Sequence, residues 1–139
     1  NEEKSLESKQ FLHIMAQALV LSGIAMEIAG NTRPCSGSEH LFSHALDEKY
    51  DLAVPHGLLV ALGSVAACIL QGRDPSILLK YLKSYGISVN PKDLGITKEM
   101  FIQAWLTARH TRPDRFTVLN TLKLYALLFE NIYYQLLEV

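Results

Sequence analysis

Apolar residues recur at helical spacing along most of this chain, and no stretch shows the sustained apolar–polar alternation of a half-buried strand. The first apolar run predicts one long helix from Ser5 or Ser8 to Ala29, with Ser8 as a fitting N-cap and Gly30 as a stop. Its apolar side chains fall on nearly every face, which predicts a central helix surrounded by others. Gly23 inside it suggests a close approach between two helices.

Breakers and caps divide the rest of the chain into shorter elements. The predicted helices are one that starts near Glu39 with Ser38 as its N-cap, one from Pro55 to Gln71, one from Asp74-Pro75 to Ser84, one from Thr97 to about Arg109, and one from Thr117 to Leu137. The segment between 47 and 54 is predicted to be a connection. The pattern therefore predicts an all-α fold, a bundle of about six helices in a single domain over residues 1–139.

The composition supports a globular domain and gives no reason to expect certain classes of binding partner. Of 139 residues, 49% are hydrophobic and 19% charged, which excludes a disordered chain. The formal net charge of −1 gives no electrostatic reason to expect nucleic acid or an anionic membrane surface. Two cysteines, Cys35 and Cys68, are too few for a disulfide framework, so we expect a reduced, cytoplasmic protein.

The N-terminal segment carries no targeting signal in its first nine residues, which are charged and lack an apolar core. The chain also lacks an initiator Met, which predicts a fragment or a processed piece. Residues 11–29 are the one candidate for a membrane span, but the segment contains His13, Gln17 and Glu27. We therefore expect a buried core helix and no stable membrane insertion.

Three of the five histidines lie within seventeen positions, from His40 to His56. His40 and His44 are one helical turn apart, so they project from the same face of a helix. Neutral imidazole is the commonest metal ligand, and a catalytic zinc takes three protein ligands and keeps one open position. The cluster could supply two of the three, and Asp47 is a possible third within the chain.

Small and polar residues surround these histidines, which a purely packing role does not require. They are Arg33, Ser36, Gly37, Ser38, Glu39, Ser43 and Gly57. The alternative is that the cluster arose by chance and that the protein is a helical interaction module with incidental histidines. We expect His13 and His110, which lie outside the cluster, to be structural.

Two stretches form the first motif: Arg33-Pro34-Cys35-Ser36-Gly37-Ser38-Glu39-His40-x-x-Ser43-His44 and, after it, His56-Gly57. Together they resemble the C-terminal part of the sn-glycerol-1-phosphate dehydrogenase family. Downstream, Arg112-Pro113-Asp114-Arg115-Phe116-Thr117 is similar to that family's Arg-Pro-x-Arg-(Tyr/Phe)-Thr segment. The family belongs to the superfamily of iron-containing alcohol dehydrogenases, glycerol dehydrogenases and dehydroquinate synthases, and the match is closer to its archaeal branch. The resemblance covers nearly the whole chain. It implies the C-terminal helical domain of a two-domain, dehydroquinate synthase-like enzyme whose N-terminal α/β nucleotide-binding domain is absent from this chain.

The resemblance also implies roles for individual residues. His40 and His56 would be metal ligands, and the family's third ligand, an Asp in an upstream helix, has no counterpart here. His44 would line the substrate site as a hydrogen-bonding or proton-relay residue, and so act in both binding and catalysis. Arg33 stands seven residues before the first ligand, where related dehydroquinate synthases carry an Arg that contacts a charged group of the substrate. Leu58 is a departure, because many superfamily members have Glu there.

The implied reaction is reduction of dihydroxyacetone phosphate to sn-glycerol 1-phosphate, a precursor of archaeal membrane lipids, with NAD or NADP as cofactor and a metal as Lewis acid. By ligand type we expect Zn²⁺, with Fe²⁺ or Ni²⁺ as alternatives. The full-length enzyme is expected to be a homo-oligomer. This helical part has no glycine-rich loop after a strand, so alone it should be inactive. The competing enzyme interpretation is a glycerol or other alcohol dehydrogenase that acts on an unphosphorylated substrate.

Overall fold

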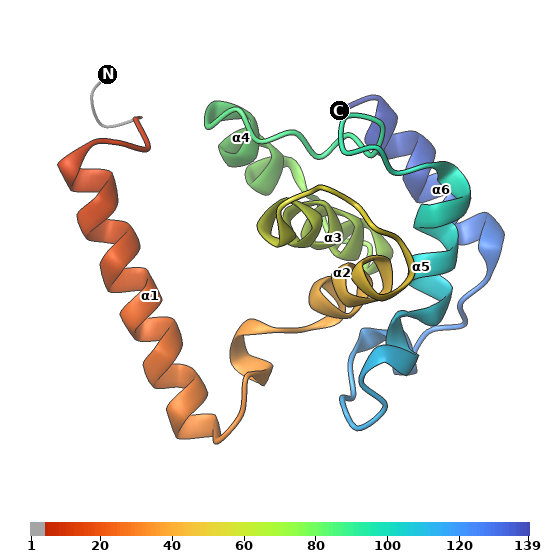
Figure 1. Cartoon of the computed structure of the whole chain (residues 1–139), viewed down its shortest axis with the longest axis horizontal. Helices are drawn as coiled ribbons and strands as arrows, with labels where there is room; N and C mark the ends of the chain where they lie inside the picture. Colours follow the sequence, from red (N-terminus) through yellow and green to blue (C-terminus); the bar gives the residue numbers. More distant parts are fainter. Residues whose placement is uncertain (1–4) are drawn as a thin grey trace.

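The computed structural model describes residues 5–139, and within them the chain forms helices and no strand (Figure 1). The elements are α1 (Lys9–Ala29), η2 (Arg33–Cys35), α2 (Ser38–Lys49), α3 (His56–Leu70), α4 (Ser76–Ser84), α5 (Lys98–Thr111), η3 (Val118–Asn120) and α6 (Ala126–Leu137). The prediction of an all-α domain with six helices is confirmed.

The core lies where α2 packs against α3 and α5, and α5 packs against α6. At its centre the Trp105 ring stacks on Phe42 at 4.6 Å and on Phe129 at 5.7 Å between ring centroids. All three side chains are fully buried. Burying one such side chain stabilises a fold by roughly 1.5–3 kcal/mol, so this stack is a main source of stability.

Helices α2 and α3 approach each other closely at Gly63. A Cβ atom there would lie 2.9 Å from the backbone oxygen of Glu39 and 3.1 Å from a ring carbon of Phe42. Only a residue without a side chain fits at that distance, so Gly63 sets the spacing between the helices that carry the histidines. Gly57, on the same helix, has nothing within 4 Å.

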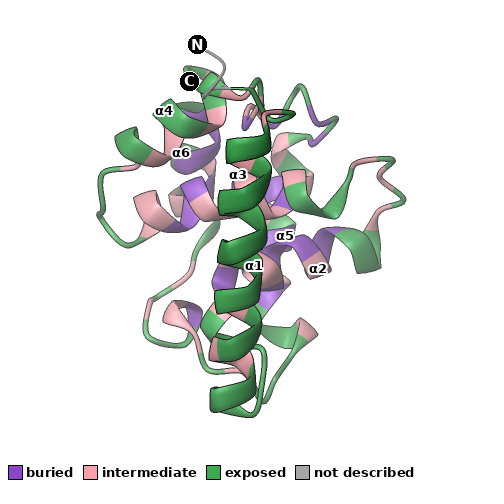
Figure 2. Ribbon diagram, turned by 90° about the vertical axis from the view of Figure 1, so that its left-hand side faces the viewer, coloured by how far each residue is buried: buried purple, intermediate pink, exposed green. Residues whose placement is uncertain are grey.

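Helix α1 has the predicted ends but not the predicted surroundings. Ser8 accepts a hydrogen bond from the Phe11 amide, and Gly30 ends the helix at φ 65°. No residue of α1 is buried, so the expectation of a central, buried helix is wrong (Figure 2). The predicted close approach at Gly23 is wrong too, since nothing lies within 4 Å of a Cβ there.

The position of α1 has a physical reason. The other helices close a complete core around Trp105, and the loop that follows Gly30 leads α1 away from it (Figure 1). The helix touches the remainder through η2 and through Phe11, whose ring lies 5.2 Å from that of Tyr85. By length and composition α1 is long and apolar enough to cross a membrane. Its exposed apolar side chains are Leu12, Ile14, Met15, Leu19, Val20, Leu21, Ile24 and Ile28.

The predicted helix from Thr117 to Leu137 is also wrong in its first half. Thr117 and Asn120 form a reciprocal capping box around the short turn η3, in which Asn120 Oδ1 accepts from the Thr117 amide at 2.9 Å. These side-chain bonds compete with helical ones, so the chain turns and α6 begins only at Ala126. The remaining predicted helices lie within two or three residues of the observed ones.

Candidate functional site

The beginning of α2 is held by Glu39 rather than by the predicted cap, Ser38. Gly37 occupies the N-cap position, and Oε1 of Glu39 accepts its backbone N–H at 2.7 Å. The same oxygen lies 2.9 Å from Nδ1 of His40. Burial raises the pKa of Glu39, but the bonds from Gly37 and His40 outweigh it and hold that pKa below its ordinary value. Glu39 is therefore an anion at neutral pH, and it fixes the His40 ring.

His56 opens α3 and is oriented by α2. Its Nδ1 lies 3.0 Å from Oγ of Ser43 and 3.1 Å from Oδ2 of Asp47. Asp47 can reach it because α2 continues to Lys49, beyond the connection predicted to begin at Asp47. Asp47, considered as a metal ligand from the sequence, instead pairs with His56 in this structure.

The carboxylates of Glu39 and Asp47 favour the same tautomer in the rings of His40 and His56. An ionised carboxylate only accepts hydrogen bonds, so Nδ1 of His40 and Nδ1 of His56 each carry hydrogen. In the neutral ring Nε2 then has a free lone pair. Metal-binding histidines commonly show this arrangement, in which a carboxylate holds the ring nitrogen opposite the ligating one.

The structure brings His40, His44 and His56 together. The ring centroids of His40 and His56 are 5.7 Å apart, and those of His44 and His56 are 5.6 Å apart. Within residues 5–139 there is no group of three His, Cys, Asp or Glu side chains placed to hold a metal ion. The described residues thus offer two imidazoles oriented by carboxylates, fewer than the three protein ligands of a catalytic zinc site.

His44 has a different environment from its two neighbours. Burial lowers its pKa, the charges of Arg112 and His56 lower it further, and Asp47 acts in the opposite direction. The pKa of His44 therefore lies below its ordinary value, which favours the neutral ring. A neutral imidazole offers one hydrogen-bond donor and one acceptor, as a proton-relay residue requires.

A cavity of about 390 Å³ opens beside these histidines. It is lined by Met26, Thr32, Cys35, Ser36, His40, His44 and Arg115. Arg33 is not among the lining residues, and its Nη2 donates to the backbone oxygen of Phe116 at 2.6 Å. Arg115 was not singled out from the sequence, although it closes the Arg-Pro-x-Arg motif. This Arg-Pro-x-Arg motif, far from the histidines in the sequence, was the signal that could have identified Arg115 as a site residue.

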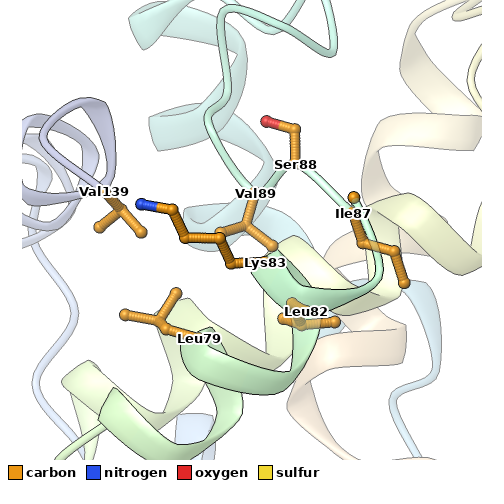
Figure 3. Close-up of a pocket in the computed structure, with 8 residues that line it drawn as sticks. Leu79, Leu82, Lys83, Ile87, Ser88, Val89 and Val139 are labelled. Atoms are coloured by element: carbon orange, nitrogen blue, oxygen red, sulfur yellow. The ribbon is translucent and has the colours of Figure 1, made fainter. Parts of the chain in front are cut away.

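A second cavity, of about 240 Å³, lies between α4, the loop after it and the C-terminal residue (Figure 3). Its lining is mainly aliphatic, with Lys83 and Ser88 as the polar side chains, and it shares no residue with the histidine cavity. It contains no histidine, aspartate or glutamate side chain. The histidine cavity is the candidate site because it brings together two of the three clustered histidines and Arg115.

No family model matches the chain. Curated relatives do, and they are named glycerol-1-phosphate dehydrogenase with the specification NAD(P)+. The relative from Caldivirga maquilingensis is 45% identical over 112 residues, which are 78% of this chain and 32% of the relative. That from Saccharolobus solfataricus is 42% identical over 112 residues, 81% of this chain and 32% of the relative. That from Nitrosopumilus maritimus is 37% identical over 124 residues, 89% of this chain and 35% of the relative.

The chain thus spans about a third of the length of the relatives that it matches. Over that third it is a homologue of the archaeal glycerol-1-phosphate dehydrogenases, and it corresponds to their C-terminal part. The resemblance found in the two sequence motifs is confirmed.

Proposed function

We propose that this chain, a homologue of one third of a glycerol-1-phosphate dehydrogenase, is the metal- and substrate-binding part of an oxidoreductase. The whole enzyme would reduce dihydroxyacetone phosphate to sn-glycerol 1-phosphate with NADH or NADPH. The observation that carries the proposal is the group of three imidazoles, of which His40 and His44 line one cavity and His56 lies against both; Nδ1 of His40 and of His56 is held by a carboxylate.

His40 and His56 would hold the metal through Nε2. The third ligand, an Asp by resemblance, is expected from the part of the enzyme outside this chain. Zn²⁺ fits imidazole and carboxylate ligands, and Fe²⁺ and Ni²⁺ are the alternatives. When bound, such a metal supplies a Lewis acid that polarises a carbonyl group.

The residues of this chain would orient the site and move a proton. Glu39 and Asp47 keep His40 and His56 in the tautomer that leaves Nε2 free. Carbonyl reduction adds a hydride to the carbon and a proton to the oxygen. His44, on the cavity wall and with a lowered pKa, is the proposed donor of a hydrogen bond to that oxygen and a relay for its proton.

Arg33 remains a proposed substrate-binding residue. A guanidinium suits a phosphate because its fork of N–H groups matches phosphate oxygens. Its side chain is exposed, and the contact to Phe116 places it next to the segment that carries Arg115.

Other expectations concern the whole protein. We assign nucleotide binding to the part of the relatives that this chain does not cover, and therefore expect the 139 residues to be inactive alone. A cytoplasmic location and a homo-oligomer of the complete enzyme are likewise proposed. They rest on the resemblance.

The direct test is NADH and NADPH oxidation by the intact protein, with dihydroxyacetone phosphate and dihydroxyacetone compared. We expect a clear preference for the phosphorylated substrate and a product of the sn-glycerol 1-phosphate configuration. A preference for dihydroxyacetone or glycerol would favour the other dehydrogenases of the superfamily. Absence of turnover on all of them, together with absence of bound metal, would favour an interaction module.

A further inference from the structure

The Arg115 side chain crosses from the segment after α5 to the loop before α2. Its Nη1 donates to Oγ of Ser36 at 2.5 Å, and its Nη2 donates to Oγ1 of Thr32 at 2.9 Å. Arg33 makes the reverse connection through the backbone oxygen of Phe116. Two guanidinium groups therefore join the two segments, and one of them, that of Arg115, lines the histidine cavity.

The charge of Arg115 is not balanced by a carboxylate in the described part of the chain. The ion pairs found in residues 5–139 involve other groups, including Arg112 with Glu48. Arg115 is nevertheless half-buried and lines the cavity. A partly buried cation without an anion is costly, so a ligand anion at this place would be bound favourably.

Arg115 also has donors to spare. A guanidinium carries five N–H groups, and the contacts with Ser36 and Thr32 use at most three of them. At least two remain for a ligand. The hydroxyl groups of Thr32 and Ser36 lie on the same cavity wall and can each donate a further bond to an oxyanion.

The cavity has the size and chemistry for a small phosphorylated molecule. Its volume of about 390 Å³ lies in the range typical of small-molecule sites. The lining contains His40 and His44, one helical turn apart on α2, and also Arg115 hydrogen-bonded to Thr32 and Ser36. A substrate that carries both a carbonyl and a phosphate could use the imidazoles for the first group and the guanidinium with its hydroxyl partners for the second.

We propose that Arg115, with Thr32 and Ser36, forms the oxyanion site that binds the phosphate group of the substrate. This proposal rests on the proposed function, because it names the group that binds one end of the same substrate. Arg33, proposed above as a substrate-binding residue, in addition holds the segment of Arg115 in position through the backbone of Phe116.

The first test is the kinetics of the intact enzyme with dihydroxyacetone phosphate and with dihydroxyacetone. Losing charge-assisted hydrogen bonds of this kind lowers binding by roughly ten- to a hundredfold. We expect Arg115→Ala to lose that factor in kcat/KM for the phosphorylated substrate, mainly through KM, and little for dihydroxyacetone. Arg109→Ala on α5, which removes an exposed cation outside the cavity lining, is the matched control and should resemble the wild type.

Conservative variants separate binding from positioning. Arg33→Lys should restore most of the activity that Arg33→Ala loses, because a single N–H to the Phe116 oxygen is all that must be replaced. Arg115→Lys should recover less, since an ammonium group cannot match the fork of contacts to Ser36, Thr32 and phosphate. Equal losses for both substrates in Arg115→Ala and Arg115→Lys would overturn the proposal, since they would indicate a structural role.

The second test needs no turnover. Inorganic phosphate is titrated into the intact protein, and the ring signals of His44 and His40 are followed by NMR. We expect phosphate to shift the His44 signals in the wild type and in Arg109→Ala, but not in Arg115→Ala. An identical response in Arg115→Ala would overturn the oxyanion site. If that response is lost in Arg115→Ala while the enzyme reduces no dihydroxyacetone phosphate, the oxyanion site stands and the proposed reaction fails.

Discussion

Gly63 offers the sharpest test of how the fold positions the site. In Gly63→Ala the new methyl group would lie 2.9 Å from the backbone oxygen of Glu39 and 3.1 Å from the Phe42 ring. Neither neighbour can rotate away, because one is helix backbone and the other is fully buried. Overpacking of this kind costs about 1–3 kcal/mol, while replacing Gly by Ala inside a helix gains about 1 kcal/mol. The difference is a net loss of about 0–2 kcal/mol in the free energy of unfolding, and because the obstacle is backbone we expect the upper half of that range, about 1–2 kcal/mol.

The matched control is Gly57→Ala, six residues earlier on α3, where a methyl group meets nothing within 4 Å. This variant should gain up to about 1 kcal/mol from helix propensity alone. Urea unfolding can be followed by the fluorescence of Trp105, the single Trp in the chain and fully buried. If Gly63→Ala proves as stable as Gly57→Ala, then α2 and α3 are not in close contact at this point. The spacing of His40 and His56 would then need another explanation.

Two further predictions concern stability. The pKa of Glu39 is lowered in the folded state, so the contribution of this carboxylate to stability is complete above its ordinary pKa of 4.5 and is lost as the pH falls through the lower, folded pKa. In Glu39→Gln, the free energy of unfolding measured in urea should therefore depend less on pH in that acidic range. A pH profile identical to that of the wild type would contradict the lowered pKa. Thr97→Ala removes the N-cap of α5 and should lower the free energy of unfolding, measured by Trp105 fluorescence, by about 0.5–2 kcal/mol. Ser8→Ala removes the N-cap of α1, which has no buried residue, and should reduce the helical circular dichroism while leaving the unfolding transition seen by Trp105 unchanged. Equal effects of the two variants on the Trp105 transition would show that α1 unfolds together with the core.

Local sequence signals predicted most of the helix boundaries. Ser8, Thr97 and Gly30 are caps whose chemistry acts within a few residues, so the sequence alone locates them. The single helix predicted over 117–137 failed because its apolar periodicity continues through the turn at Asn120, where side-chain bonds replace helical ones. Apolar periodicity indicates which residues face a core. A turn between two segments can leave that periodicity unbroken, so the pattern alone did not reveal the turn.

The surroundings of α1 could not be predicted in the same way. A helix that is apolar on every face is expected to be buried, but in the structure the other helices leave α1 uncovered, and its own sequence does not indicate which elements lie next to it. Likewise, the spacing of His40, His44 and His56 predicted a cluster, but the partners of the rings depended on tertiary packing. Asp47 became a partner of His56 only because α2 continues past it.

The role of Arg115 could not be predicted from the sequence. It lies 75 positions after His40 in the sequence, and its two hydroxyl partners flank Arg33, the arginine that spacing alone favoured. Only the folded chain shows which of the two lines the cavity.

We propose His40 and His56 as metal ligands, and the zinc, iron and nickel content of the purified intact protein tests that assignment. We predict stoichiometric metal in the wild type and in His110→Ala, whose ring lies outside the cluster, and strongly reduced metal in His40→Ala and in His56→Ala. Unchanged metal content in both of the last two variants would contradict the ligand assignment and the function proposed from it.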